Sequence, residues 1–307
     1  MAAITIAKQR NSRRNVIYSN QLDVVIPVKD RPTIGQCVLT IKESLSKVGN
    51  VELGNILVCD GGSQTATCQR QMAIIQQIPK VTVLSLSQKG FNKSWLLNQG
   101  IQTAKAPIVL ISDADILWSA TAIRAMMAIV REQTQTVCCI RAVKESEPNF
   151  SVPAKLRYTY RIESARRKRL VEIYPTAVNP SRRPGCGLLC ARRSLFLQVG
   201  GYCHSFEHWG WEDRDFLIRA ELMGYQRVER GNVVHLSHGD SLRNLPEGGS
   251  ILESRDRNIR ICLNRLAKGQ LIGDLQHERS LENLPVAYNQ PIQTRYVPMS
   301  ASTIISS

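Results

Sequence analysis

The chain has 307 residues, of which 43% are hydrophobic and 21% charged, so we expect a folded protein with a sizeable core rather than a disordered chain. Its formal net charge of +15 favours contact with polyanions such as nucleic acid, anionic lipid or phosphorylated substrates. No apolar run is long enough to span a bilayer, and the N-terminus lacks the apolar segment of a secretory signal, so we expect neither a membrane-spanning nor a secreted protein.

The first half of the chain alternates strand patterns with helical patterns. Apolar runs that stop at Pro, Gly or Asp predict strands, and apolar residues spaced three and four apart predict helices. The predicted strands are 22–28, 55–59, 81–86 and 108–111, and the predicted helices are 33–48, a segment ending at residue 76, and 93–104. This order is typical of an α/β fold whose mostly parallel central sheet has helices on both faces, with the carboxyl ends of these strands at one edge.

The second half of the chain is predicted to mix helices, strands and loops. The helices are 120–131, 155–171, 192–199, 210–223 and 251–267, and the strands are 136–140, 185–190, 226–228 and 233–236. The helix 155–171 would place Arg157, Arg161 and Lys168 roughly on one face, which is typical of a solvated surface or of a patch that faces an acceptor or a membrane. Residues 144–153 read as a loop, and the Pro- and Arg-rich loop 175–184 is a candidate lid.

The termini and the cysteines indicate the organisation and the compartment. We expect residues 1–20 to be a basic flexible arm, residues 21–275 to form a single domain, and residues 276–307 to be a loose tail. Nine cysteines form no Cys-x-x-Cys pair and lie mostly in apolar runs, which favours buried thiols in a reducing cytoplasmic compartment. We find no nucleic-acid motif, so we expect no specific nucleic-acid partner, whereas peripheral contact with the anionic inner face of a membrane would fit the charge.

Two carboxylates follow the predicted strand 108–111. In an extended backbone, Asp113 and Asp115 point to the same side, because alternate side chains do. Two carboxylates at the end of a buried strand repel each other unless a cation lies between them, and a hard divalent ion that bridges to a diphosphate is the natural candidate. The alternative is a turn in which the two side chains only cap backbone groups.

A second acidic motif runs from His208 through two tryptophans to Asp215. It places Glu212, Asp213 and Asp215 in the first turn of the predicted helix, where the helix dipole favours ionised carboxylates. The simple alternative is an N-cap beside a tryptophan in the core. Because capping needs only one acid, and because tryptophan faces stack on sugar rings, a site is the favoured interpretation.

Two histidines, His235 and His238, follow the last predicted strand. A single histidine is usually only a satisfied polar residue, but here the aspartates need a further ligand. Imidazole together with carboxylate suits Mn²⁺ better than an all-oxygen site, which would favour Mg²⁺. A zinc site is a weaker alternative, because its candidate ligands do not have a common zinc spacing. Those candidates are Cys186, Cys190, His204 and His208.

Five segments in chain order carry a family resemblance. They are residues 26–31, 91–98, 112–115, 185–202 and 209–213. Together they resemble the nucleotide-sugar glycosyltransferases of the GT-A fold, which has a Rossmann-like α/β domain. The resemblance is strongest to the β-1,4-galactosyltransferase branch and its bacterial relatives in family 2. Arg214 departs from the eukaryotic pattern, which has an acid there, and the single glycine between the tryptophans is equally similar to the chondroitin-polymerase and N-acetylgalactosaminyl branches.

The resemblance implies an inverting enzyme that moves galactose, N-acetylgalactosamine or a related hexose from a UDP-sugar to a hydroxyl of a glycan or lipid-linked glycan. It implies that Asp213 is the base and that Glu212 holds acceptor hydroxyls. It also implies that Mn²⁺ or Mg²⁺ is held by Asp115 with His235 or His238. Residues 21–118 would bind the donor, and residues 119–275 would form the acceptor and catalytic half. The implied UDP-sugar contacts are Pro27, Val28, Arg31, Asp60, Lys93, Asp113 and Trp211.

Other functions remain as alternatives. The positive charge favours a polyanion- or nucleic-acid-binding protein, but the acids gathered at one sheet edge oppose it, because phosphate backbones avoid such a cleft without metal. A non-catalytic transferase-like domain would not need the adjacent Glu212 and Asp213. A nucleotidyltransferase could use Asp113 and Asp115, but it would not need the tryptophan motif.

Overall fold

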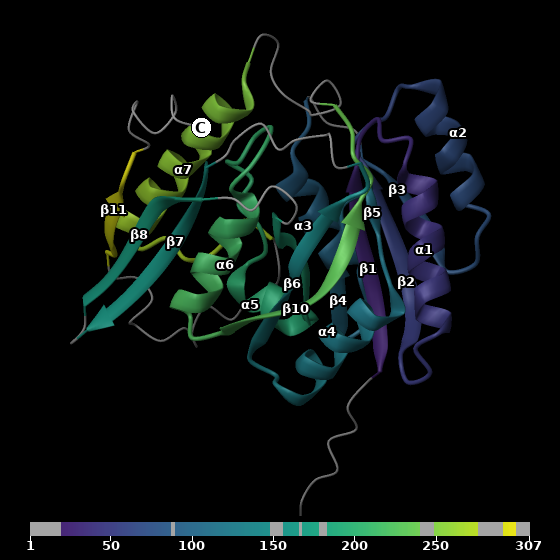
Figure 1. Cartoon of the computed structure of the whole chain (residues 1–307), viewed down its shortest axis with the longest axis horizontal. Coiled ribbons are helices and arrows are strands. Elements are labelled where there is room, and N and C mark those ends of the chain that lie inside the picture. Colours follow the sequence, from purple (N-terminus) through teal and green to yellow (C-terminus); the bar gives the residue numbers. More distant parts are fainter. Residues whose placement is uncertain are drawn as a thin grey trace, which may run out of the picture.

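The computed structural model describes residues 20–86, 90–147, 156–165, 168–177, 183–239, 249–275 and 291–298. In this part of the chain a central sheet lies between two layers of helices, and a small second sheet lies at one side (Figure 1). Across the central sheet the strand order is β3 (Val81–Ser85), β2 (Glu52–Asp60), β1 (Gln21–Val28), β4 (Ile108–Ile111), β9 (Arg183–Arg192), β6 (Thr136–Glu145), β10 (Gln226–His235) and β5 (Ile116–Leu117).

The central sheet is mostly parallel, as the sequence predicts. Strands β1 to β4 are parallel to one another, and β6 is parallel to β10. Strand β9 runs antiparallel between β4 and β6, and β5 runs antiparallel to β10. The sheet is therefore mixed, with its two reversed strands in the second half of the order.

Helices bury the sheet on both faces, which is why its inner strands are almost continuously apolar. Strand β1 is buried along nearly its whole length. One hydrophobic core lies under α1 (Ile34–Ser46), α2 (Ala66–Ile75) and α4 (Ala120–Glu132). The other core lies under α3 (Lys93–Thr103), α5 (Arg193–Val199), α6 (Glu212–Leu222) and α7 (Ile251–Ala267).

The predicted basic helix 155–171 is wrong. The segment instead forms β7 (Leu156–Ala165), which pairs antiparallel with β8 (Lys168–Ala177), and β11 (Gln293–Tyr296) pairs parallel with β8. The spacing of the basic residues suggested a helix, but the apolar residues have a period of two. Tyr158 and Tyr160 are buried on β7, whereas Arg161, the next residue, is exposed and pairs with Glu172.

Other predicted boundaries also need correction. Strand β10 is one strand where two were predicted, because Gly231, with φ of +69°, lets it continue through a bend. Strand β6 extends to Glu145, so the predicted loop 144–153 begins later. The predicted loose tail contains β11, and Ile292 before it is buried. The ends of the predicted lid loop 175–184 belong to β8 and β9. The centre of that loop, 178–182, the rest of the tail, and residues 1–19 of the predicted arm 1–20 lie outside the described residues.

The topology brings the ends of several strands to one edge of the sheet. The register pairs His235 with Glu145 on β6 and with Ile116 on β5, so the residue before Ile116, Asp115, lies beside them. Nearby, the carboxylate of Asp30 accepts hydrogen bonds from the backbone N–H groups of Gln64 and Thr65 at 2.7 and 2.8 Å. In the segments that the structure describes, no helix is both long and apolar enough to cross a membrane.

Candidate active site

A cavity of about 510 Å³ opens at this edge of the sheet. It is lined by almost all of the predicted site residues: Pro27, Val28, Arg31, Lys93, Asp113, Asp115, Trp211, Glu212, Asp213, His235 and His238. Asp60 does not line it. The carboxylate of Asp60 instead accepts hydrogen bonds from the backbone N–H and hydroxyl of Ser63, at 3.0 and 2.6 Å, and so caps the turn after β2.

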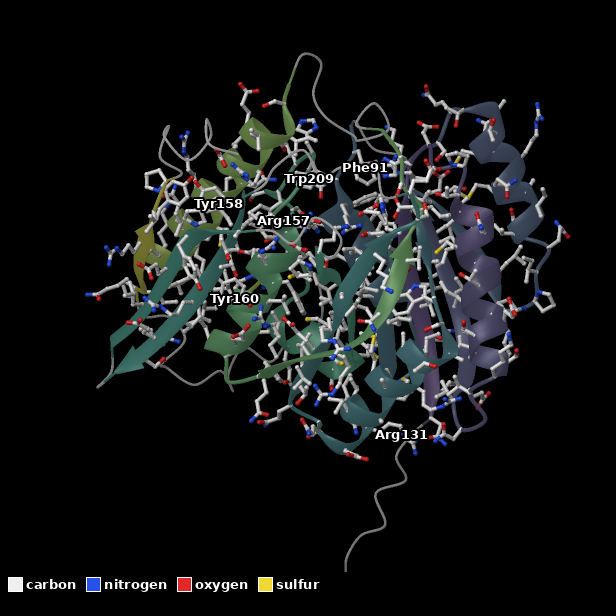
Figure 2. All side chains as sticks on the ribbon, viewed as in Figure 1. Phe91, Arg131, Arg157, Tyr158, Tyr160 and Trp209 are labelled. Carbon is white, nitrogen blue, oxygen red and sulfur yellow. The ribbon has the colours of Figure 1, made fainter. Side chains whose placement is uncertain are left out.

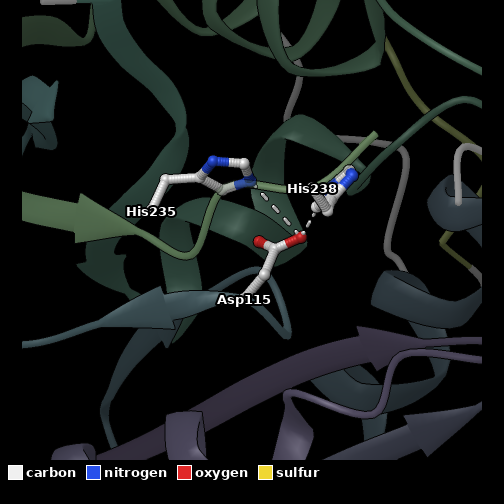
Figure 3. A group of neighbouring side chains, drawn as sticks. All are labelled: Asp115, His235 and His238. Atoms are coloured by element: carbon white, nitrogen blue, oxygen red, sulfur yellow. Dashed lines mark ion pairs between the residues drawn. The ribbon is translucent and has the colours of Figure 1, made fainter. Parts of the chain in front are cut away.

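Asp115, His235 and His238 form a compact group of potential ligands (Figure 3). Their ligand atoms all lie within 4.8 Å of one another. Oδ2 of Asp115 is 3.5 Å from Nε2 of His235 and 3.2 Å from Nε2 of His238. The other ring nitrogens have partners of their own: Nδ1 of His235 lies 2.6 Å from Oε2 of Glu145, and Nδ1 of His238 lies 2.9 Å from the carbonyl of Gly239.

This donor set fits a divalent transition metal. Since both Nδ1 atoms face oxygen acceptors, each neutral ring would carry its proton on Nδ1 and direct the Nε2 lone pair at the Asp115 carboxylate. A lone pair facing an anion is unfavourable unless a cation or a proton lies between them. One carboxylate oxygen with two imidazole nitrogens is a set that suits Mn²⁺.

The short distances within the group shift the pKa values of Asp115, His235 and Glu145. Burial raises the pKa of Asp115, but the two rings, which donate from Nε2 when a proton there takes the place of a cation, and the nearby Arg31 outweigh burial and hold that pKa well below its usual value. Burial lowers the pKa of His235, but Asp115 and Glu145 raise it further than burial lowers it. Burial likewise raises the pKa of Glu145, and its contacts with His235 and Arg183 bring it down to about 2.

Lys93 contacts one carboxylate from each of the two acidic motifs, Asp113 and Glu212. It lies in the first turn of α3, which Asn92 caps by accepting a hydrogen bond from the Trp95 backbone at 2.9 Å. Its Nζ is 2.7 Å from Oδ1 of Asp113 and 3.2 Å from Oε1 of Glu212. The structure therefore separates the roles of the two strand-end aspartates, because Asp113 pairs with Lys93 whereas Asp115 faces the histidines.

Glu212 and Asp213 begin α6 at the wall of the cavity. The backbone before them turns sharply, with φ of +96° at Gly210 and +77° at Trp211. Burial raises the pKa of Glu212, although Lys93 opposes the shift. Asp213 faces Gly187 on β9, where an added Cβ would lie 3.4 Å from Oδ2 of Asp213. The glycine thus keeps the space beside Asp213 open.

The two tryptophans have different environments. Trp211, expected to form a wall of the sugar site, lines the cavity but is only 2% exposed, because it is packed in the core beneath the Arg214 guanidinium. Trp209 belongs to the predicted motif 209–213 but was not among the predicted site residues; it is 36% exposed at the cavity. Ser254 on α7 fixes its backbone, with hydrogen bonds of 3.1 Å from the Trp209 N–H and 2.9 Å to its carbonyl.

The third acid of the motif, Asp215, has a structural role. It is fully buried and pairs with Arg219 one turn later, at 2.7 Å. The Arg219 guanidinium also donates to the carbonyls of Val199 and Gly201, at 3.1 and 2.9 Å. This network ties α6 to the turn after α5 and so holds the start of α6 at the cavity.

Three further residues, Glu145, Arg157 and Arg183, line the cavity and belong to no recognised motif. Of these, only Arg157 was named from the sequence, on a basic face for which contact with an acceptor was one alternative. The zinc alternative is not supported, since His204 instead contacts Asn98 at 2.8 Å and, in the described segments, the Asp115 group is the one histidine, cysteine and acid cluster with metal-like spacing.

Comparison with known families identifies the chain. The sequence model described as glycosyl transferase family 2 matches residues 23–185, more than half of the chain. The chain belongs to glycosyl transferase family 2. A second model, described as the N-terminal domain of galactosyltransferase, matches residues 174–239, which include the start of α6, His235 and His238.

Two proteins similar to this family 2 chain are named as N-acetylgalactosaminyltransferases. The chain is 24% identical over 204 residues to polypeptide N-acetylgalactosaminyltransferase 4 of Caenorhabditis elegans, and the match covers 60% of this chain and 33% of the worm protein. It superposes with a TM-score of 0.57 and 13% identity on the crystal structure of GalNAc-T7 with UDP, GalNAc and Mn²⁺, covering 81% of this chain and 49% of the other. The chain thus spans a third to a half of these proteins, and the structural likeness confirms the GT-A fold.

Proposed function

We propose that this family 2 chain transfers galactose, N-acetylgalactosamine or a related hexose from a UDP-sugar to a hydroxyl of a glycan or lipid-linked glycan. The observation that carries the proposal is the placement, in one cavity, of the Asp115, His235 and His238 group with the Lys93, Glu212 and Asp213 cluster. The first is suited to a diphosphate-bound cation. In the second, Glu212 is paired with Lys93, whereas Asp213 accepts a hydrogen bond from the backbone N–H of Arg214 at 2.7 Å.

In this proposal, residues 21–118 bind the donor. Pro27, Val28 and Arg31 would contact the nucleoside at the end of β1, with Asp60 shaping the neighbouring turn. Asp113 and Lys93 would face the ribose and phosphates, and Lys93 supplies positive charge there. Burial lowers the pKa of Lys93, but Asp113 and Glu212 raise it well above its usual value, so the ammonium group stays charged.

Asp115, His235 and His238 would hold Mn²⁺, or Mg²⁺ in its place. When bound, the metal would offset the negative charge that develops on the departing diphosphate. This chain's own residues prepare the site, because Glu145 orients the His235 ring and Gly239 orients that of His238. The Mn²⁺ and UDP named with the GalNAc-T7 structure support the same choice of metal and nucleotide here.

Residues 119–275 would provide the acceptor and catalytic half. Asp213 would take the proton of the acceptor hydroxyl as the acceptor oxygen bonds to the anomeric carbon and the bond to the UDP phosphate breaks, which inverts the configuration. Glu212, held by Lys93, would orient acceptor hydroxyls, and Trp211 with Trp209 would border the sugars. The chain's positive charge would suit contact with an anionic membrane surface if the acceptor is lipid-linked.

Titration calorimetry of UDP in the presence and absence of Mn²⁺ tests the donor site. We expect UDP to bind the wild-type protein with Mn²⁺ and to bind much more weakly after EDTA treatment. Asp115→Ala should abolish the metal-dependent part, and Glu43→Gln, which changes an exposed acid that pairs with Lys47, should not. The proposal would be contradicted if the affinity for UDP changed neither on removal of Mn²⁺ nor in the Asp115→Ala variant.

A further inference from the structure

Three arginines from three separate elements line one side of the cavity. Arg157 lies on β7, Arg183 begins β9, and Arg214 lies in the first turn of α6. The labelled Arg157 lies between the small sheet and α6, close to Trp209 in the same view (Figure 2). The small sheet thus contributes a cation to a cavity that strands of the central sheet and helices α3, α6 and α7 also line.

Acidic groups lie near two of these arginines, Asp213 near Arg214 and Glu145 near Arg183. Arg183 pairs with Glu145 at 3.0 Å, but the same carboxylate also contacts His235. The Arg214 guanidinium lies 5.2 Å from the centre of the Trp211 ring. Within the described segments, the guanidinium of Arg157 makes no ion pair and no hydrogen bond.

The proximity of the three cations affects Arg157 directly. Burial lowers its pKa, and the neighbouring charges of Arg183 and Arg214 lower it further, to about 10. A partly buried guanidinium without a counter-ion is costly, and an anion bound between the arginines would remove that cost. The arrangement is therefore more favourable with an anion present than without one.

Arg157 and Arg214 lie on the acceptor side of the cavity, whereas Arg183 lies between them and His235, beside Glu145. Arg214 directly follows Asp213, the proposed base, whereas the proposed donor groups Asp113 and Asp115 end the first half of the chain. Beside Arg157, the Tyr158 ring lies beneath the Arg255 guanidinium at 4.7 Å. The rim there carries exposed apolar surface from Trp209 and from Leu252, which is 49% exposed, and such surface suits the C–H face of a sugar.

We propose that the acceptor sugar carries an oxyanion, a carboxylate or a phosphate, and that Arg157 binds it together with Arg183 and Arg214. The inference rests on the proposed transferase function and names the acceptor class. Guanidinium groups bind both kinds of oxyanion through paired N–H donors, so a hexuronic acid and a sugar phosphate share the chemistry that this cluster recognises. Binding there would place the acceptor hydroxyls next to Asp213.

The test compares matched neutral and anionic sugars on protein saturated with UDP and Mn²⁺. The probes are glucose, glucuronic acid and glucose 6-phosphate, and their binding is followed by calorimetry or ligand-observed NMR. We expect at least one anionic sugar to bind about tenfold or more tightly than glucose, since charge-assisted hydrogen bonds have about this strength. The two anionic probes also distinguish a carboxylate from a phosphate acceptor.

The variant Arg157→Gln should weaken the binding of the anionic sugar by about ten- to a hundredfold and leave glucose binding unchanged. Arg157→Lys keeps the charge but loses the paired donors, so its effect should be intermediate. Arg295→Gln is the matched control, because it removes an equal charge from β11, where Arg295 is 67% exposed and pairs with Glu172. Circular dichroism checks that each variant folds.

Equal binding of neutral and anionic sugars, or an Arg157→Gln variant that binds as the wild type does, would overturn the acceptor inference. So would an anionic sugar that binds only in the absence of UDP, since it would then occupy the donor diphosphate position. Each of these results leaves UDP binding, and so the proposed function, intact. Failure of the wild-type protein to bind UDP with Mn²⁺ would instead refute the proposed function itself.

Discussion

Glu145 and His235 face each other across the paired strands β6 and β10, with Oε2 of Glu145 2.6 Å from Nδ1 of His235. The contact fixes the orientation of the imidazole, so that its Nε2 is directed at Asp115. Partners of this kind orient metal-binding histidines and raise their basicity. Glu145 therefore positions the His235 ring within the group formed by Asp115, His235 and His238, although no sequence motif contains it.

Glu145→Gln should weaken Mn²⁺ binding by about ten- to a hundredfold, because the amide is a poorer acceptor for the His235 N–H. The measurement is calorimetric titration of Mn²⁺ in the presence of UDP. Glu163→Gln, which changes an exposed acid on β7, should leave the affinity unchanged. Equal Mn²⁺ affinity in Glu145→Gln and wild type would show that Glu145 has no part in metal binding.

Metal binding should depend on pH in a defined direction. Asp115 and Glu145 raise the pKa of His235 above 6.5 against the effect of burial. Below this raised pKa the ring must lose a proton before it can bind a metal, so Mn²⁺ affinity should fall as pH falls through it and level off above it. In Glu145→Gln the fall should move to lower pH. Titrations across the histidine range would count against this account if affinity did not change with pH.

Asp213→Asn should lower sugar transfer by about 10²- to 10⁴-fold, which is the usual contribution of a positioned base. The binding of UDP and Mn²⁺ should remain, because Asp213 does not belong to the group around Asp115. Steady-state transfer assays and calorimetry on the same preparation separate the two effects. Turnover close to that of the wild type would rule out Asp213 as the base.

Arg219→Met should lower the free energy of unfolding by about 3–5 kcal/mol, because it leaves the Asp215 carboxylate buried without its partner. Denaturant unfolding followed by fluorescence measures the change. Arg161→Gln, which disrupts ion pairs of a half-exposed arginine, should cost about 1 kcal/mol or less. Similar losses in the two variants would show that the Asp215–Arg219 pair does not hold the start of α6.

The sequence predicts the first half of the fold well, for a physical reason. Strands such as β1 and β4 are short, apolar and buried on both faces, and the helices between them have clear periodicity. The segment around β7 misleads because Arg157 and Arg161 have a helix-like spacing. The alternation of Tyr158, Tyr160 and Ile162 was the better signal, since it places apolar residues on one face of a strand.

The candidate site was predictable where one short motif carries several functional groups. Asp113 with Asp115, and Glu212 with Asp213, are such motifs, and the structure brings both to one cavity. Glu145 was not predictable, because its role depends on the register between β6 and β10. The different partners of Asp113 and Asp115 also arise from tertiary contacts with distant residues.

The most direct test of the central claim is the release of UDP from a panel of UDP-sugars by the purified chain, with Mn²⁺ and with EDTA. We predict release from one donor, dependent on Mn²⁺, stopped by EDTA and lost in Asp115→Ala. That result would establish the transferase and name the sugar. No release and no UDP binding with any divalent metal would contradict the account and favour a polyanion-binding protein with a transferase-like fold.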